Sequence, residues 1–350
     1  MSSSDVASHY NSVKQSGIAE RKGSRIYHLR NINNWMKSCL INDGLKLLRD
    51  DCVYEPKILD LCCGKGGDLR KWNNAKAASV VMTDIAEVSI DQAKGRYEEM
   101  KGRNGNPPFP AQFITLDSCN NDLLPHIDPS FLPIDLVSCQ FAFHYSFVDE
   151  SSARQMLRNA VSSLREGGLF IGTLPDADRI VWAARSASDN DNKWENRVCS
   201  VHYNASSSLD NPPLFGAKFD FSLDEQVNCP EFLAYFPLLV QLAEEEGMEL
   251  LWEKRFPLSA HQYLKNTHER NLLYKMSGLK VLPQEKNTAV KEEFEHVSQW
   301  MDGDEISVVR EEEGEGNGRK NSFLGTISQA EWQAFSMYIL FCFKKKTTLI

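Results

Sequence analysis

Short apolar runs alternate with amphipathic segments along the first half of the chain. The runs indicate strands, and the apolar residues between them recur at the three- and four-residue spacing of helices. Strands are expected at 57–61, 79–84, 112–117, 134–140 and 169–174. Strands that alternate with helices predict an α/β fold with a doubly wound, mainly parallel sheet and right-handed crossovers. Ligands in such folds lie at the carboxyl ends of the strands.

Amphipathic segments before and between these strands indicate the helices that cover the sheet. The first has apolar positions from Ile32 to Leu48, is expected to break near Gly44, and forms an N-terminal helical extension. The others are expected at 67–73, 86–101 and 150–165.

The second half of the chain is less regular, and two of its segments indicate insertions before the last strand. Residues 185–212 are rich in Ser, Asn and Asp and suggest a surface insertion, whereas 303–322 are acidic and glycine-rich and are expected to be disordered. A seventh sheet strand is expected at 336–343, after a capping box that begins at Ser328. The remaining elements are a strand at 213–222, a helix at 231–246, a sixth sheet strand at 248–256 and a weak helical pattern over 259–300.

Composition and charge limit the class of protein. The 350 residues suit one large α/β domain or two smaller ones, and we expect a single domain at 31–346 behind a flexible, polar and basic segment at 1–30. No apolar run approaches the ~18 residues that span a bilayer, and the first residues lack the apolar core of a secretory signal. The nine cysteines have no zinc-ligand spacing, which favours reduced thiols and predicts no metal site. The formal net charge of −9 means that any nucleic-acid contact should be short and local.

A glycine-rich turn follows the first expected strand. From Ile58 to Trp72 the sequence is ILDLCCGKGGDLRKW, which places a strand, a loop with glycines and a helix start in succession. This is the layout of a nucleotide-type cofactor site, in which glycines let backbone N–H groups approach the ligand. Asp84 ends the next strand after Asp60, where a carboxylate can accept hydrogen bonds from both ribose hydroxyls of an adenosine. For the loop alone, a plain tight turn is the alternative.

Aromatic residues crowd the segment directly after the fourth expected strand. Residues 141–147 are FAFHYSF, which places several rings and a histidine on the edge where ligands are expected. Such rings stack on nucleobases for about 1–3 kcal/mol each, and His144 can hydrogen-bond a base edge. A buried aromatic plug explains the same composition equally well.

These segments together resemble a known family. The resemblance runs from about Tyr10 to Lys344 and implies a class I, Rossmann-like methyltransferase fold that uses S-adenosylmethionine. The acceptor would be N7 of the guanosine cap of mRNA (GpppRNA). The segments that look like eukaryotic mRNA cap guanine-N7 methyltransferases are SRIYHLRNINNWMKSCLI, the glycine loop, SCQFAFHYSF, PLFGAKFDF and PEFLAYFPLL.

The resemblance also implies the residues of both sites. Among them, Tyr145, His144 and Glu231 are expected to orient the substrate without acting as acid or base. One departure is Cys62, where the family usually has glycine, so that a Cβ and a sulfur must fit close to the cofactor. The cofactor site falls on Lys37, Cys62, Asp84, Asp117, Gln140 and Tyr145, to which the glycine loop adds Asp60 and Gly64. The cap site falls on Asn33, Asn34, Lys65, Lys71, Arg96, His144, Glu231 and Tyr338.

The chemistry of these residues suits the implied roles, although each has a more ordinary explanation. Lys65, Lys71 and Arg96 can face one edge of the sheet and bind a triphosphate bridge, but most Lys and Arg are solvated surface charge. Glu231 can accept from guanine N1–H and the exocyclic amine, a pair of donors that adenine lacks. The alternative for Glu231 is a stabilising charge at a helix N-terminus, and the alternative for Tyr338 is ordinary core.

The implied reaction requires neither a general base nor a metal. Guanine N7 carries a lone pair and a sulfonium is an activated methyl donor, so proximity, in-line orientation and a favourable field should suffice. Three other interpretations stay open, namely another RNA or small-molecule methyltransferase, a catalytically silent cap-binding scaffold, and a nicotinamide oxidoreductase. The family's substrate implies a nuclear enzyme that acts on the capped 5′ end of mRNA. An activating subunit or the transcription machinery stays open as a further partner.

Overall fold

The computed structural model describes residues 11, 22–101, 105, 107–203, 208–224, 227–280 and 327–347. Most of the N-terminal segment predicted at 1–30 lies outside these residues. So do the acidic segment predicted at 303–322 and the part of the weak helical pattern that follows residue 280.

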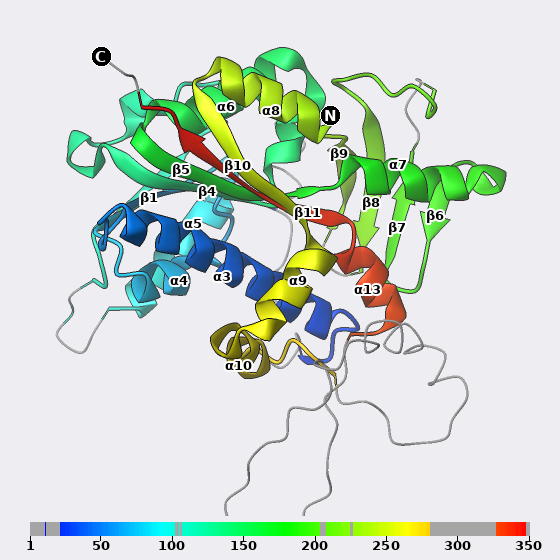
Figure 1. Cartoon of the computed structure of the whole chain (residues 1–350), viewed down its shortest axis with the longest axis horizontal. Coiled ribbons are helices and arrows are strands. Elements are labelled where there is room, and N and C mark those ends of the chain that lie inside the picture. The colour runs from blue at the N-terminus through cyan, green and yellow to red at the C-terminus, as the bar shows by residue number, and fades with distance from the viewer. Residues whose placement is uncertain are drawn as a thin grey trace, which may run out of the picture.

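A seven-stranded sheet forms the centre of the molecule, with the strand order β10-β11-β5-β4-β1-β2-β3 (Figure 1). β1 to β5 pair in parallel, and β11 is antiparallel to both of its neighbours. This arrangement confirms the predicted doubly wound, mainly parallel α/β sheet. The strands are β1 (Lys57–Leu61), β2 (Ser79–Asp84), β3 (Ala111–Thr115), β4 (Ile134–Gln140), β5 (Leu164–Pro175), β10 (Met248–Arg255) and β11 (Tyr338–Lys345).

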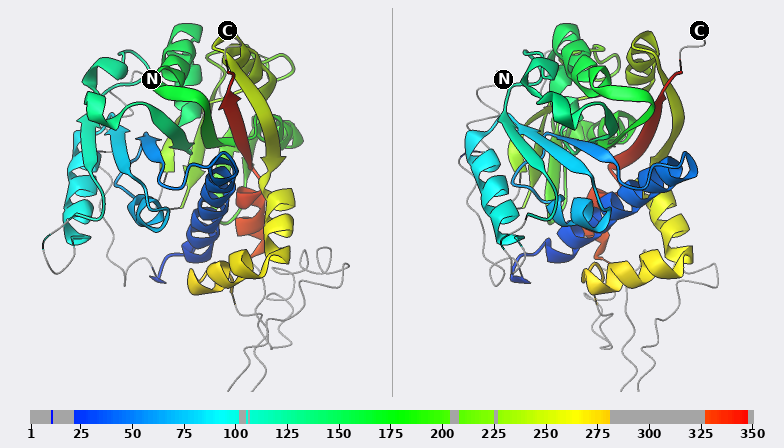
Figure 2. Two further views of the ribbon diagram at one scale, coloured as in Figure 1. Left: turned by 60° about the vertical axis from the view of Figure 1, so that its left-hand side comes forward. Right: turned by 90° about the vertical axis from the view of Figure 1, so that its left-hand side faces the viewer.

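Helices cover both faces of the sheet, because successive residues of a strand point to opposite faces. α3 packs on one face against residues such as Ile58 and Leu136, whereas α6 and α8 pack on the other against Leu59 and Val137 (Figure 2). The helices are α3 (Tyr27–Asp50), α4 (Leu69–Asn74), α5 (Glu87–Glu99), α6 (Glu150–Ser162), α7 (Ala177–Ser186), α8 (Phe236–Glu245), α9 (Phe256–Lys265), α10 (Thr267–Lys275) and α13 (Gln329–Phe335). None of these described helices is long and apolar enough to cross a membrane.

The N-terminal helix does not break at Gly44, and that part of the prediction is wrong. α3 continues through this residue, which is buried against the sheet. A Cβ added to Gly44 would lie 3.4 Å from Leu136 and 3.6 Å from Ile171. The glycine therefore serves close helix–sheet packing, which outweighs the roughly 1 kcal/mol that glycine costs a helix relative to alanine.

A second, four-stranded antiparallel sheet with the order β6-β7-β8-β9 follows α7. The segment predicted as a surface insertion at 185–212 contributes β6 and β7 to it, and the strand predicted at 213–222 begins only with β8. The helix predicted at 231–246 is wrong at its start, because residues 231 and 232 end β9 and α8 begins at Phe236. The strands are β6 (Lys193–Glu195), β7 (Cys199–His202), β8 (Lys218–Leu223) and β9 (Val227–Phe232).

Candidate active site

Two cavities adjoin each other at the edge of the large sheet where the parallel strands end. Cavity A, of about 300 Å³, is lined by the glycine loop after β1 and by the ends of β2 and β4. Cavity B, of about 260 Å³, lies between α3, β9 and the segment after β4. Lys37, Phe141 and Tyr145 line both cavities, so ligands in the two would meet across these side chains.

The structure brings the residues predicted for the cofactor together on cavity A. They come from α3, the carboxyl ends of β1, β2 and β4, the glycine loop, and the segments after β3 and β4. The residues are Lys37, Asp60, Cys62, Gly64, Asp84, Asp117, Gln140 and Tyr145.

Asp84 shapes the glycine loop as well as facing the cavity. Its Oδ2 accepts a hydrogen bond from the backbone N–H of Gly64 at 2.8 Å, and its Oδ1 accepts one from Ala86 at 2.9 Å. Burial raises the pKa of the Asp84 carboxyl above its usual range, although both backbone hydrogen bonds oppose that shift. Gly64 has a φ of +53°, which a glycine adopts without strain.

Cys62 has a φ of +59°, in the same left-handed region. For a residue with a Cβ this conformation costs about 1–2 kcal/mol, which is the physical reason to expect glycine there. A hydrogen bond with Cys139 and burial raise the pKa of the Cys62 thiol well above its ordinary value. The thiol is therefore neutral beside the cavity.

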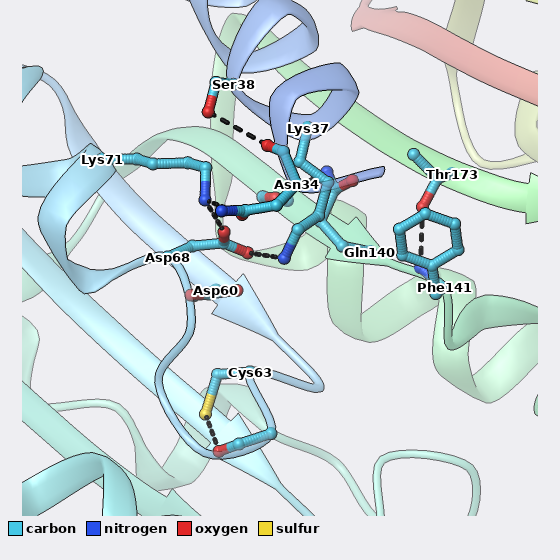
Figure 3. A network of polar contacts seen from close by, with 12 residues as sticks. Asn34, Lys37, Ser38, Asp60, Cys63, Asp68, Lys71, Gln140, Phe141 and Thr173 are labelled. Carbon is cyan, nitrogen blue, oxygen red and sulfur yellow. Dashed lines mark hydrogen bonds and ion pairs between the residues drawn. The ribbon is translucent and has the colours of Figure 1, made fainter. Parts of the chain in front are cut away.

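A buried carboxylate, Asp68, gathers two lysines between α3 and α4 (Figure 3). Lys37 Nζ lies 2.8 Å from Asp68 Oδ2, and Lys71 Nζ lies 2.5 Å from Asp68 Oδ1. Burial would raise the pKa of Asp68, but the charges of Lys37 and Lys71 outweigh it and hold that pKa below its ordinary value. Lys71 also donates to Asn34 Oδ1 at 2.5 Å. The Lys71 ammonium is thus paired with Asp68, and its hydrogen bond holds Asn34 at the wall of cavity B.

Asp60 lies near this cluster at the end of β1. Its Oδ2 accepts a hydrogen bond from Trp72 Nε1 at 2.9 Å. Burial and the neighbouring charge of Asp68 raise the pKa of Asp60 to about 7. Two buried carboxyl groups beside one cavity therefore differ in protonation near neutral pH.

Cavity B contains an acidic side chain with two partners. Glu231, which is 5% exposed, has its Oε2 3.3 Å from His144 Nε2, and its Oε1 accepts from the Tyr145 hydroxyl at 3.4 Å. Glu231 lies on β9 and not at the start of a helix, which removes the helix-terminus explanation for it. Asn33 Oδ1 is buried and has no hydrogen-bond partner within the described part of the chain. The cavity is thus equipped to recognise a polar, planar edge.

Most, but not all, of the residues predicted for the cap line cavity B. Asn33, Asn34, His144, Glu231 and Tyr338 do so. Tyr338 also packs edge-on against Phe141, with ring centroids 5.0 Å apart, so its core and cavity roles coexist. The predicted phosphate-binding residues Lys65, Lys71 and Arg96 are not among the residues that line either cavity.

Arg30 is a cavity residue that the sequence interpretation missed. It was expected in a flexible N-terminal segment, but it lies in the first turn of α3 and lines cavity B. Arg30, Asn33, Asn34 and Lys37 have the spacing of one helical face. That polar stripe was the signal that could have extended the predicted helix to Arg30. Phe141 and Leu223 also line cavity B without having been singled out for the cap.

A model of the mRNA (guanine-N(7))-methyltransferase domain matches residues 1–346 of the chain. The chain belongs to this family. It is therefore an enzyme, an mRNA (guanine-N7)-methyltransferase that uses S-adenosylmethionine, which confirms the resemblance noted in its motifs. No cluster of His, Cys, Asp and Glu suited to a metal ion occurs among the residues that the structure describes.

Named relatives share nearly the whole chain. The mRNA cap guanine-N(7) methyltransferase of Caenorhabditis elegans is 50% identical over 99% of this chain and 88% of its own length. That of Drosophila melanogaster is 40% identical over 97% of this chain and 76% of its own length. Among solved structures, the CcbJ methyltransferase from Streptomyces caelestis aligns with a TM-score of 0.45 and 10% identity, covering 90% of each chain. That distant likeness supports no comparison of sites.

The lining of cavity A fits S-adenosylmethionine on structural grounds. Gln140 Oε1 is buried at the cavity and has no hydrogen-bond partner among the described residues, so it is available to a polar ligand group. Asp84 offers carboxylate oxygens at the strand end where ribose hydroxyls are bound in such folds. Apolar residues such as Leu116 and Met156 supply a surface for a flat base.

Proposed function

We propose that the two cavities divide the methylation of the mRNA cap between them, with S-adenosylmethionine in cavity A and the guanosine of GpppRNA in cavity B. The single observation that carries this proposal is the shared wall of Lys37, Phe141 and Tyr145. Two ligands that contact the same three side chains can bring a methyl group and its acceptor together where the cavities meet.

In cavity A, the proposed contacts follow from the groups available. Asp84 would accept hydrogen bonds from the ribose hydroxyls, and Gln140 would bind a polar group of the ligand. Gly64 would contribute backbone, and Asp117 the wall after β3. Asp60 would support the loop through Trp72, since its Oδ2 already accepts from that indole.

In cavity B, Glu231 would accept from N1–H and the exocyclic amine of guanine. Its two oxygens already lie near His144 and Tyr145, which would hold the carboxylate in plane with the base. Asn33 and Asn34 would add hydrogen bonds from α3, and Tyr338 would close the apolar side.

The cap phosphates would be bound by Lys65 and Arg96 at the outer edge of the site. Arg30 joins them in this proposal, because it lines cavity B from α3. The role proposed for Lys71 is now indirect, since its ammonium holds Asn34 and Asp68. Guanidinium and ammonium groups suit a phosphate bridge because they donate several hydrogen bonds with a full charge.

The protein's part in the transfer is binding and orientation. When bound, S-adenosylmethionine supplies a methyl group that its sulfonium has already activated. Tyr145, His144 and Glu231 would hold guanine N7 in line with that group, and no residue would need to move a proton, because N7 enters the reaction with a lone pair. The Glu231 carboxylate, which accepts from the Tyr145 hydroxyl of the shared wall, would favour the positive charge that passes from sulfur to the base.

The capped 5′ end of mRNA is the partner that this function requires. Caps are added to nascent transcripts, so the proposed location is the nucleus. An imaging experiment on the tagged, full-length chain tests the location, and a cytoplasmic pool alone would contradict it.

The function is tested by transfer of labelled methyl to GpppRNA, with nuclease mapping of the product. We expect label at guanine N7 and none in uncapped RNA. An inosine-capped RNA keeps N7 and N1–H but lacks the exocyclic amine, so it should have a higher KM. In Glu231→Gln the preference for the guanosine cap over the inosine cap should shrink. Unchanged cap affinity and activity in that variant would refute the proposed guanine recognition, and binding of both ligands without transfer would indicate a silent scaffold.

A further inference from the structure

Phe141 lies where the two cavities meet, in a backbone conformation that is unusual for its side chain. It directly follows β4, has a φ of +58° and lines both cavity A and cavity B. Bulky residues rarely adopt the left-handed region, and they persist there only where the surroundings hold them. The groups that hold Phe141 are therefore candidates for a functional role.

Thr173 of β5 holds the backbone of Phe141 (Figure 3). The Phe141 N–H donates to Thr173 Oγ1 at 2.8 Å and lies 3.2 Å from the Thr173 carbonyl oxygen. Thr173 is fully buried and pairs in the sheet with Gln140, the residue before Phe141. The Thr173 hydroxyl thus accepts a hydrogen bond from the Phe141 N–H at the point where the chain leaves strand β4.

Aromatic neighbours limit the Phe141 ring from the other side. The ring meets Tyr338 edge-on, with centroids 5.0 Å apart and an interplanar angle of 87°. Phe256 contacts it in a similar way at 6.0 Å. These rings restrict where the Phe141 ring can go, but they do not set its backbone angle. The backbone N–H, by contrast, is held by its two hydrogen bonds to Thr173.

We propose that Thr173 is a positioning residue for methyl transfer, whose hydroxyl holds the Phe141 ring beside the point where the two ligands meet. This inference rests on the proposed assignment of cavity A to S-adenosylmethionine and cavity B to the cap. A small shift of this ring changes how donor and acceptor face each other more than it changes the contacts at the far ends of either ligand. The expected effect is therefore on turnover more than on binding.

Two substitutions separate the hydroxyl from the shape of the side chain. Thr173→Val removes the hydroxyl and keeps the volume, and we expect it to lower kcat about 10- to 100-fold. KM for S-adenosylmethionine and for GpppRNA should stay within about threefold of the wild type. Thr173→Ser keeps the hydroxyl and should restore kcat to within about threefold of the wild type.

Thr83→Val is the matched control. Thr83 is also a fully buried strand residue, in β2, but its Oγ1 has no hydrogen-bond partner within the described part of the chain. The same exchange there should leave kcat at the wild-type value. A loss in Thr83→Val as large as that in Thr173→Val would overturn the inference, and so would wild-type kcat in Thr173→Val or equal losses in the Val and Ser variants.

A double-mutant cycle with Phe141→Ala tests whether Thr173 acts through the ring. In the Phe141→Ala background, Thr173→Val should cost little further kcat, because the group that it positions is gone. Equal losses in both backgrounds would also overturn the inference. If Thr173→Val does not fold by circular dichroism, Thr173→Ala takes its place in the cycle. A wild-type protein that leaves GpppRNA unmethylated would instead refute the proposed function, so the two failures are distinct.

Discussion

Two buried carboxyl groups beside cavity A carry opposite shifts in their pKa. Asp68 is paired with two lysines, which keep its pKa below the ordinary value against the effect of burial. Asp60 has one indole donor and the charge of Asp68 nearby, and its pKa rises to about 7. The wall of the cavity therefore gains negative charge as the pH passes through neutrality, and this change is linked to the stability of the fold.

The pH dependence of stability should report the titration of Asp60. The folded state binds a proton at Asp60 more tightly than the unfolded state does, so its stabilising contribution is complete below about pH 4 and is lost as the pH rises towards 7. Asn cannot ionise, so Asp60→Asn does not lose this contribution. As the pH rises from about 4 to 7, the free energy of unfolding of Asp60→Asn should increase relative to that of the wild type, by at most about 1.4 kcal/mol per pH unit. Urea unfolding at several pH values measures the difference.

An exposed aspartate provides the control for that experiment. Hydrogen bonds from Ser130 lower the pKa of Asp128. Asp128 is therefore ionised in both the folded and the unfolded state between pH 5 and pH 7. The difference in free energy of unfolding between Asp128→Asn and the wild type should not change over this range. A flat difference for Asp60→Asn as well would show that Asp60 is already ionised in the folded state at low pH.

Backbone strain at Cys62 makes a second prediction at the residue scale. Because its φ is +59°, glycine should fit this position better than alanine, and Cys62→Gly should be more stable than Cys62→Ala by about 1 kcal/mol. Both variants lose the thiol, so the comparison isolates the backbone. Cys63 does not have a positive φ, and there the order should reverse, with Ala above Gly. Urea unfolding of the four variants measures both differences. A Cys62→Ala variant that is more stable than Cys62→Gly would contradict the proposed backbone strain.

At the residue scale, local motifs predicted more of cavity A than of cavity B. Asp60 and Asp84 lie at the carboxyl ends of two strands and Gly64 in the loop after the first. The order of these elements along the sequence is therefore enough to predict that the three residues lie together. Glu231 and Arg30 reach cavity B from elements far apart in the sequence, and only the family resemblance pointed to Glu231. Arg30 was missed because the apolar pattern of α3 starts later than the helix itself.

Among the elements, α6 supports the far wall of cavity A through a buried amide. Asn159 is 2% exposed and donates to the carbonyl oxygens of Ser118 and Asn121 at 2.8 Å each. Its Oδ1 accepts from the backbone N–H of Leu123 at 2.9 Å. The loop after β3, which carries Asp117 into the cavity, is thus tied to the helix by this buried amide.

Removal of that amide should cost both stability and cofactor binding. Asn159→Ala leaves buried backbone groups without partners, so the free energy of unfolding should fall by about 2–4 kcal/mol. KM for S-adenosylmethionine should rise because the loop loses its support. Gln155 lies one turn earlier on α6. It donates to Asp122 at the surface and makes only long contacts, of 3.4 Å each, with Asn121 and Asn159, so Gln155→Ala should change stability by only about 0.5 kcal/mol. Equal effects in urea unfolding of the two variants would contradict the role of Asn159.

The elements that the sequence mispredicted are those that tertiary pairing decides. Residues 231 and 232 directly precede a segment with a helical pattern and are included in the helix predicted there. In the structure they pair with β8 and form the end of β9. Pro230 is compatible with this strand because β9 is at the edge of its sheet. Gly44 has the composition of a helix break, yet the packing of α3 on Leu136 and Ile171 favours a continuous helix.

At the scale of the whole molecule, the alternation of strands and helices was enough to predict the architecture. Local patterns place the strands along the sequence, and the handedness of crossovers makes them parallel. The small antiparallel sheet did not follow, because β6 to β9 are short and separated by loops with little periodicity. That sheet carries Glu231, so the proposed guanine recognition depends on the part of the fold that local patterns predict least.

The net charge of −9 leads to the last prediction, which concerns how much RNA the enzyme contacts. An acidic protein whose proposed phosphate ligands are only Arg30, Lys65 and Arg96 should bind the triphosphate bridge and little of the chain beyond it. A single-strand contact with about three phosphates gives a slope near −2 for the logarithm of affinity against the logarithm of salt concentration. We therefore expect GpppG and a GpppRNA of about twenty nucleotides to have kcat/KM values within about threefold of each other. Uncapped RNA of the same length is the control and should compete weakly. A steep salt dependence that grows with RNA length would contradict the prediction and would place a second, extended RNA contact on this acidic surface.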